Sequence, residues 1–208
     1  MPNMTPSTKT DGMSDGQIDK AADALRSAFA AKLRAHRVEF RVVATQQALG
    51  AKGLIPDMFA VFRRYVELFD NLIVRLVYPD RNRTPMAVLD ATGRKQYTNE
   101  SVVAGMPRGT GEEAKVVFFK LGHFISDIDL DKEYESRGFK PADPFSLAAV
   151  NEADPAFADE HPNATQWKDA DGKWCYAAFF LWLDERRVLV RRHDYVWHGF
   201  WWFAGLAS

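Results

Sequence analysis

The sequence is poor in cysteine, since Cys175 is the only one among its 208 residues. One cysteine cannot form an intrachain disulfide, and no Cys/His spacing typical of a zinc site is present. The chain begins without the charged and apolar regions of a signal peptide. Its longest apolar run, residues 174–183, is far shorter than the roughly 20 residues that cross a bilayer. These absences predict a cytoplasmic protein that makes no membrane contact.

Recognisable catalytic and nucleotide-binding motifs are also absent. The glycine-rich loop 105–111 is followed by Glu112 and Glu113, whereas a P-loop ends in Gly-Lys-Ser/Thr. Arg108 in this loop is nevertheless a candidate anion contact. No Ser/His/Asp order or Cys/His pair can be assigned. The missing motifs favour a non-enzymatic protein without a cofactor, which works by binding.

The first part of the chain predicts a disordered leader and then a helix. Residues 1–13 are rich in Pro, Ser and Thr and contain little that can be buried. Ser14 suits a helix N-cap, with Gln17 as its capping-box partner. The apolar residues at helical spacing that follow are Ile18, Ala22, Leu25, Phe29 and Leu33. This pattern predicts a helix over about 15–36.

A second helix is predicted to start at Pro56, because proline suits the first helical position and Asp57 favours the N-terminal end. Apolar residues recur at spacings of three and four as far as Leu76, and Pro79 ends the pattern. Between the two helices, the β-branched run 38–43 predicts a short strand. The wide apolar stripe of the second helix predicts that it packs on the protein's own core.

The middle of the chain predicts short elements. Residues 86–90 and 95–98 flank a turn that contains glycine, which predicts a hairpin. The continuous apolar run 116–121 has the length of a buried strand. Segment 126–159 is acidic and rich in Pro and Ala, and we expect it to be irregular apart from a short helix at 144–150.

All six tryptophans lie in the last third of the chain. Segments 173–183, 187–192 and 195–203 are separated by turn signals and predict an antiparallel meander. The first of these strands is apolar on both faces, so we expect it to be central and buried on both sides. Since helices precede strands, the fold class is predicted to be α+β. We expect one domain over 14–208, with N-terminal helices packed on a C-terminal, aromatic-rich antiparallel sheet.

The aromatic tail also allows a different interpretation. Arg186, Arg187, Arg191 and Arg192 are interleaved with its rings. Sheets that combine exposed rings with arginine bind single-stranded nucleic acids by stacking and by phosphate contacts. No RNP-type motif accompanies the rings, and the two-sided apolar strand favours a core over a binding platform.

Charge is distributed unevenly along the chain. Residues 17–98 contain 14 Lys and Arg against 8 Asp and Glu, whereas residues 99–170 contain 7 against 14. A basic half of this kind can bind nucleic acid. Its candidate contacts are Arg63, Arg64, Arg81 and Arg83. Alternatively, the two halves complement each other within one fold or across a homodimer.

The acidic run that starts at Asp127 is a candidate binding surface. It is not an EF-hand, because Lys132 and Gly138 occupy the positions where that loop needs Gly and Glu. The run is either a solvated edge or a surface that docks a basic protein partner. The leading hypothesis is therefore a regulatory protein that binds a protein partner. Its contacts would be Asp127, Asp129, Asp131, Glu133 and Arg108.

The enzymatic alternative to a binding protein is a metal-dependent hydrolase or nuclease. His193, Asp194 and His198 supply groups that ligate divalent metals and act as general bases. Side chains five apart in a strand point to opposite faces, so the two histidines converge only if Gly199 or the turn distorts the strand. Acids from the 127–133 run would have to complete a metal site. Otherwise, one histidine lies in a surface turn and the other packs in the aromatic sheet.

Overall fold

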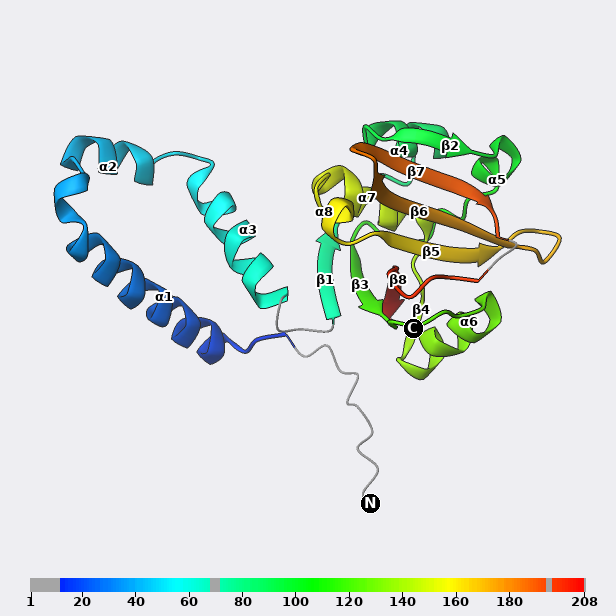
Figure 1. Cartoon of the computed structure of the whole chain (residues 1–208), viewed down its shortest axis with the longest axis horizontal. Coiled ribbons are helices and arrows are strands. Elements are labelled where there is room, and N and C mark those ends of the chain that lie inside the picture. Colours follow the sequence, from blue (N-terminus) through cyan, green and yellow to red (C-terminus); the bar gives the residue numbers. More distant parts are fainter. Residues whose placement is uncertain (1–11, 68–71, 194–195, 208) are drawn as a thin grey trace, which may run out of the picture. The chain divides into compact units, whose positions relative to one another are not determined.

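A computed structural model describes residues 12–67, 72–193 and 196–207 (Figure 1). The chain divides into two compact units, Met1–Phe69 and Asp70–Ser208, and each is described by itself. The fold class is α+β, as predicted: the first unit is helical, and the second contains an eight-stranded, mostly antiparallel sheet. The single domain over 14–208, with N-terminal helices packed on the sheet, stays a prediction.

The first unit opens with the long helix α1 (Asp15–Ala35). Its predicted capping box is confirmed, since the Gln17 backbone N–H donates to Ser14 Oγ and the Ser14 N–H donates to Gln17 Oε1 at 2.8 Å. No helix within the described ranges is long and apolar enough to span a bilayer. The predicted leader 1–13 falls, except for its last two residues, outside the described chain.

The predicted strand at 38–43 is wrong. A 3-10 turn (Arg37–Glu39) and helix α2 (Val42–Leu49) occupy this part of the chain. The backbone N–H of Thr45 donates to the carbonyl of Arg41 at 2.9 Å, which is a helical bond. Because β propensity depends on a paired neighbouring strand, a β-branched run alone does not make a strand.

Helix α3 (Leu54–Glu67) contains the predicted start at Pro56, but the prediction that this helix reaches Leu76 is wrong. Residues 68–71 lie outside the described chain, and Leu72–Val77 form strand β1. Every second side chain of β1 is buried, which is the alternation of a strand with one face on a core. A run of apolar residues fits both the helical period and the strand period, and pairing with another strand decides between them.

The predicted hairpin around Gly93 is also wrong. Thr84 caps helix α4 (Pro85–Ala91), in which proline occupies the first turn. The second half of the supposed hairpin is strand β2 (Lys95–Thr98), which pairs in parallel with a strand near the C-terminus. Helix α5 (Glu100–Ala104) follows directly. The cap and proline before residue 86 are helix signals that override the turn signal.

Segment 126–159 is largely regular, so its prediction as an irregular stretch is wrong. It contains α6 (Asp127–Ser136), β4 (Phe139–Pro141), α7 (Pro144–Ala153) and α8 (Phe157–Glu160). Only the helix at α7 was expected from the sequence. The acidic side chains of α6 are compatible with a helix because acids favour its N-terminal turn.

The sheet of the second unit has the order β1-β3-β8-β5-β6-β7-β2, with β4 paired to β8. Its remaining strands are β3 (Ala114–Lys120), β5 (Asn163–Lys168), β6 (Trp174–Trp182), β7 (Glu185–Arg192) and β8 (Trp202–Ala207). The buried strand at β3 and the antiparallel pair β6-β7 confirm predictions, whereas strand β5, which pairs with β6, was not predicted. The last strand does not lie at 195–203, because β8 begins at residue 202 and pairs with β3, β4 and β5.

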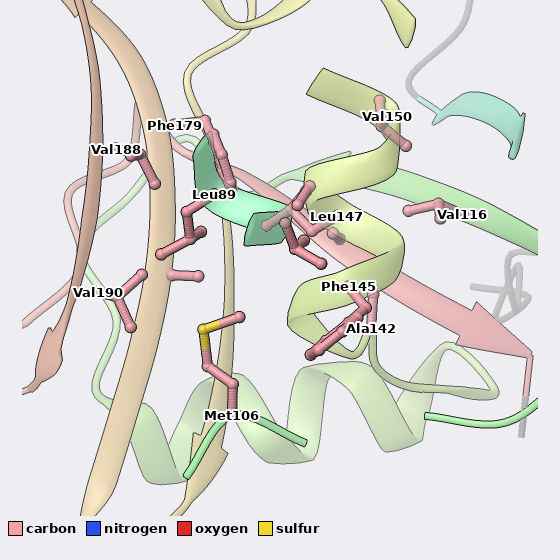
Figure 2. Close-up of a cluster of buried hydrophobic side chains, with 14 of the residues drawn as sticks. Leu89, Met106, Val116, Ala142, Phe145, Leu147, Val150, Phe179, Val188 and Val190 are labelled. Carbon is pink, nitrogen blue, oxygen red and sulfur yellow. The ribbon is translucent and has the colours of Figure 1, made fainter. Parts of the chain in front are cut away.

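One face of the sheet is covered by α4, α5, α7 and α8. Figure 2 shows Leu89 of α4 next to Val188 and Val190 of β7, with Phe145 and Leu147 of α7 nearby. All five side chains are at most 1% exposed. This layer of helices therefore shields one side of β6 and β7 from solvent.

The other face carries a second core beneath α6, in which Phe119, Tyr134 and Phe203 are fully buried. Strand β6 contributes to both cores, with Phe179 on the first face and Ala178 on the second. The prediction that this strand is buried on both sides is confirmed for its central residues.

Candidate functional site

The structure brings His193 together with Asp127. His193 follows β7, Asp127 is the first residue of α6, and His193 Nδ1 lies 2.6 Å from Asp127 Oδ1. Their side chains are only 9% and 10% exposed. Trp197 donates its indole N–H to the same oxygen at 2.8 Å. An ionised carboxylate only accepts hydrogen bonds, so Nδ1 of His193 carries the hydrogen.

Two further residues complete this group. The Gln166 amide donates to the backbone carbonyl of Asp127 at 3.0 Å, and its oxygen accepts from the Trp197 indole at 3.3 Å. The Tyr176 ring centre lies 5.3 Å from that of His193 and 5.5 Å from that of Trp197. Burial raises the pKa of Tyr176. Asp127, Gln166, Tyr176, His193 and Trp197 are called the His193 cluster below.

A close backbone approach positions Trp197 in this cluster. A Cβ atom on Gly199 would lie 2.5 Å from the backbone of Gly122, so only glycine fits there. Next to this contact, Ile125 and Trp197 exchange two backbone hydrogen bonds of 3.0 and 2.8 Å. Segment 196–201 therefore crosses the second core instead of continuing β7, and this crossing carries Trp197 to Asp127.

The residues predicted for a metal site only partly meet. Asp194 lies outside the described residues, and the His198 ring centre lies 4.8 Å from that of Phe124, at a tilted angle, and 5.6 Å from that of Phe200, on which it stacks. Within the described ranges, no group of three or more His, Cys, Asp or Glu side chains is placed to hold a metal ion. The His193 cluster ties α6, β5 and the segment after β7 together, as satisfied buried polar networks do.

Within the acidic run, the other candidate contacts pair with their own helix. Asp129 accepts from Lys132 at 2.9 Å and from Ser126 at 2.8 Å, and the hydrogen bond to Lys132 lowers the pKa of Asp129. Glu133 pairs with Arg137 at 3.3 Å. Asp131 is half-buried. The acids thus belong to a capped helix with internal ion pairs, and their role in partner binding stays a prediction.

Arg81 and Arg108 hold the glycine-rich loop. Arg81 pairs with the buried carboxylate of Asp143 at 2.8 Å and donates to the backbone carbonyl of Arg108. Arg108 donates in return to the backbone carbonyls of Arg81 and Arg83 at 2.6 Å each. These reciprocal contacts hold the loop against the segment that follows β1. The role of Arg108 as an anion contact stays a prediction.

The remaining arginines proposed for nucleic acid are divided between the units. Arg83 donates to both carboxylate oxygens of Glu152 at 3.0 and 2.9 Å, and this hydrogen bonding raises the pKa of Arg83. In the first unit, the Arg63 guanidinium lies 5.0 Å from the Phe59 ring centre. The side chain of Arg64 lies outside the described chain. Arg81 and Arg83 therefore already neutralise acids of the second unit.

The second face of the sheet is less covered towards β7 and β2. Side chains alternate along a strand, so the neighbours of Phe179 and Val188 point away from the helix layer. Beyond the part that α6 covers, rings and cations there are exposed or half-buried. We call this set the open sheet face. It consists of Lys95, Tyr97, Phe180, Trp182, Arg187 and Arg191.

In the first unit, apolar side chains surround a hollow. No residue of α1, the 3-10 turn or α2 is buried. Helices α1 and α3 line an apolar hollow of about 680 Å³, to which each helix contributes large side chains. Among them, Leu25 is 50% exposed, Phe29 48%, Met58 43% and Phe59 55%. An amphipathic stripe of this kind requires a covering surface.

The chain shows no significant match to a protein-family model, to a curated protein or to a solved structure. Function therefore has to be inferred from the chain's own geometry. Three members of the His193 cluster, Gln166, Tyr176 and Trp197, are not among the site residues predicted from the sequence. Alternation along β5 places Gln166 on the face of Tyr176, which is a usable signal once the strand is known.

Proposed function

We propose that the protein is a cytoplasmic, non-enzymatic binding protein that associates with itself through its N-terminal unit. In this proposal α1 of one copy pairs antiparallel with α1 of a second copy, and each covers the hollow of the other. The observation that carries the proposal is the exposure of the apolar stripes of α1 and α3. Monomeric proteins rarely leave a contiguous apolar patch of more than a few hundred Å² uncovered.

The energetic balance requires several of these side chains to be buried together. Burial of one large apolar side chain contributes about 1.5–3 kcal/mol. Association itself costs about 4–15 kcal/mol in lost freedom of motion. A single exposed residue is therefore insufficient, whereas the hollow offers large apolar residues from two helices in each copy. The side chains that would be covered are Leu25, Phe29, Ile55, Met58, Phe59 and Phe62.

The apolar stripe of α1 is symmetric along the helix except at its centre, where Leu25 has Arg26 as its counterpart, and this symmetry supports a second copy as the occupant. Ile18 and Leu33 lie equally far from the point between residues 25 and 26, and so do Ala22 and Phe29. Two-fold symmetric pairing brings each residue opposite its symmetric counterpart. Antiparallel α1 helices would thus place the small Ala22 opposite the large Phe29 in two equivalent contacts.

Charge along α1 supports the same orientation. Asp15, Asp19 and Asp23 lie in its first half, and Lys32 and Arg34 lie near its end. Asp19 and Lys32 are also equally far from the same midpoint, so antiparallel pairing would bring them together twice. Parallel pairing would bring like charges together instead. Exposed ion pairs are worth only about 0.2–1 kcal/mol each, so they select the orientation while the apolar stripe supplies affinity.

Other functions receive less support. Docking of a basic protein partner on the acidic run is weakened because Asp127 is buried and Asp129 and Glu133 have partners on their own helix. A metal-dependent hydrolase would need His198 beside His193, and His198 instead packs against the rings of Phe124 and Phe200.

Sedimentation equilibrium of the full chain tests the proposal. We expect the wild-type protein to be a dimer at micromolar concentration and the double variant Leu25→Asp/Phe29→Asp to be a monomer with unchanged tryptophan fluorescence. Ser27→Asp adds one negative charge to the opposite side of α1 and is the matched control for the single variant Phe29→Asp, which should also weaken association. A monomeric wild-type protein, or an equal loss of association in the control, would refute self-association through this stripe.

A further inference from the structure

The open sheet face places rings directly beside cations. Strand register places Phe180 of β6 next to Arg187 of β7, and Tyr97 lies on β2, the next strand of the sheet. The Arg187 guanidinium lies 5.0 Å from the Tyr97 ring centre, and Lys95 Nζ lies 5.6 Å from it. Arg191 donates to the Tyr97 carbonyl at 3.1 Å. This face therefore alternates flat apolar groups with positive charge.

The rings continue beyond the strands. The Phe180 ring centre lies 5.7 Å from that of Trp201, and Trp201 lies 5.0 Å from Phe200. His198 and Phe124 extend the series. Phe200 is 50% exposed, Phe124 is 64% exposed and Trp182, at the end of β6, is 56% exposed. Half-exposed rings in contact with one another form a row on which other flat groups can stack.

The charge of this face is positive. Lys95 and Arg187 share the carboxylate of Glu185, which accepts from Lys95 at 2.8 Å and from Arg187 at 2.7 Å, whereas Arg191 donates to a backbone carbonyl. The Tyr97 hydroxyl also donates to Glu185, at 2.9 Å.

The opposite face differs, because its arginines have acids of their own. Arg186 pairs with Asp159 at 2.6 Å, and Arg192 pairs with Asp169 at 3.0 Å. Excess positive charge is thus concentrated on the face that carries the exposed rings.

We infer that the open sheet face binds single-stranded nucleic acid. Unpaired bases stack on Trp182 and Phe200, and Lys95, Arg187 and Arg191 contact the phosphates. A base in a single strand has a free flat face, whereas a base within a duplex is covered by its neighbours, so stacking selects single strands. The phosphate backbone supplies the negative charge that complements Arg191 and the pair Lys95 and Arg187, which share one carboxylate. This inference is independent of the self-association proposed for the first unit.

Fluorescence anisotropy with labelled oligodeoxythymidine and oligouridine tests the inference, using the full chain. We expect both strands to bind, and the tighter one identifies DNA or RNA as the ligand. Three phosphate contacts predict that log K falls with log salt with a slope of about −2. A blunt DNA duplex of the same length should bind more weakly, because its bases are stacked on each other.

Two pairs of neighbouring residues provide matched variants. Trp182→Ala should weaken binding roughly tenfold or more, as expected for loss of one stacked base, whereas Leu181→Ala, on the other face, should not. Arg191→Ala should reduce the salt slope by about 0.7, whereas Arg192→Ala should leave it unchanged. Trp182→Phe keeps a ring and should retain most of the affinity. If Trp182→Ala does not fold, Phe200→Ala in the exposed segment replaces it.

Several results would overturn the inference. The first is the absence of binding to either strand at low salt. The second is equal affinity for duplex and single strand, which would indicate nonspecific charge contacts. The third is an equal loss in both members of a matched pair. Specific capture of a protein that competes through Trp182 without any oligonucleotide binding would assign the face to a protein partner instead.

Discussion

The two units of the chain use the same kind of sequence in different ways. In the first, α1 has a regular apolar stripe behind a complete capping box, and none of its residues is buried. In the second, helices α6 and α7 have much weaker amphipathic patterns and bury Leu130, Tyr134, Phe145 and Leu147 almost completely. Amphipathic spacing therefore shows that a surface must be covered and does not show what covers it.

The two units also differ in the property that their apolar residues determine, which is stability in the second unit and association in the first. The second unit closes one core on each side of its sheet, so most of its apolar residues are satisfied within the chain. The first unit keeps its largest apolar residues at the surface of a hollow. Substitutions in the two units should therefore change different quantities: the free energy of unfolding in the second, and the free energy of association in the first.

The largest effect is expected from the core of the second unit. Phe179→Ala should lower its free energy of unfolding by about 3–5 kcal/mol, since Phe179 is completely buried between the sheet and the helices. Urea unfolding followed by tryptophan fluorescence measures this, because all six tryptophans belong to the second unit. Phe59→Ala should leave this transition in place. A comparable loss in Phe59→Ala would show that both units share one core.

A smaller loss is expected from the His193 cluster. Asp127→Asn should destabilise the second unit by about 1–3 kcal/mol, because it weakens the acceptor of two buried donors, His193 Nδ1 and Trp197 Nε1. The same unfolding experiment applies. Asp131→Asn, on the same helix and half-buried, is the control and should stay within about 0.5 kcal/mol. Equal effects of the two variants would contradict the structural role of the cluster.

The smallest effect concerns the orientation of α1 in the proposed dimer. Asp19→Lys and Lys32→Asp should each weaken self-association, by about 0.2–1 kcal/mol for each ion pair lost. A mixture of the two variants should restore it, because antiparallel pairing then places a lysine of one copy opposite an aspartate of the other at both sites. Sedimentation equilibrium at low salt measures the three dissociation constants. If the mixture associates no better than either variant alone, the antiparallel alignment is wrong.

Local signals predicted part of the fold well. The Ser14 capping box, the helix that follows it and the antiparallel pair β6-β7 depend on residues close in sequence. The two-sided burial of β6 could be predicted because both its odd-numbered and its even-numbered residues, which point to opposite faces, are mostly apolar. In each instance the partners of a backbone group lie within a few residues or across a short turn.

Other elements could not be predicted from local signals. The run that ends at Leu76 fits both a helix and a strand, and antiparallel pairing with β3 makes it β1. Segment 38–43 has the composition of a strand, but it folds as a 3-10 turn and helix. Parallel pairing of β2 with β7 joins residues about 90 positions apart, which no turn signal reports. Such pairings depend on chain closure over long distances.

The candidate sites show the same division. His193 and the acidic run could be recognised as candidate functional groups from the sequence. The structure shows that Asp127 is the acid of that run that contacts His193, because the first turn of α6 faces the segment after β7. The open sheet face was only partly visible, since alternation separates Arg187 and Arg191 from Arg186 and Arg192 without showing which face the helices cover.

The sequence by itself determined the α+β class, the capped first helix, the central apolar strand and the chemistry available near the C-terminus, because these follow from composition and short-range spacing. Only the tertiary structure decided that His193 meets Asp127, 66 residues away, and that rings and cations remain exposed on one side of β7. The physical reason is that a cap or an alternation is completed locally, whereas burial and partnership are properties of surfaces that long-range packing creates.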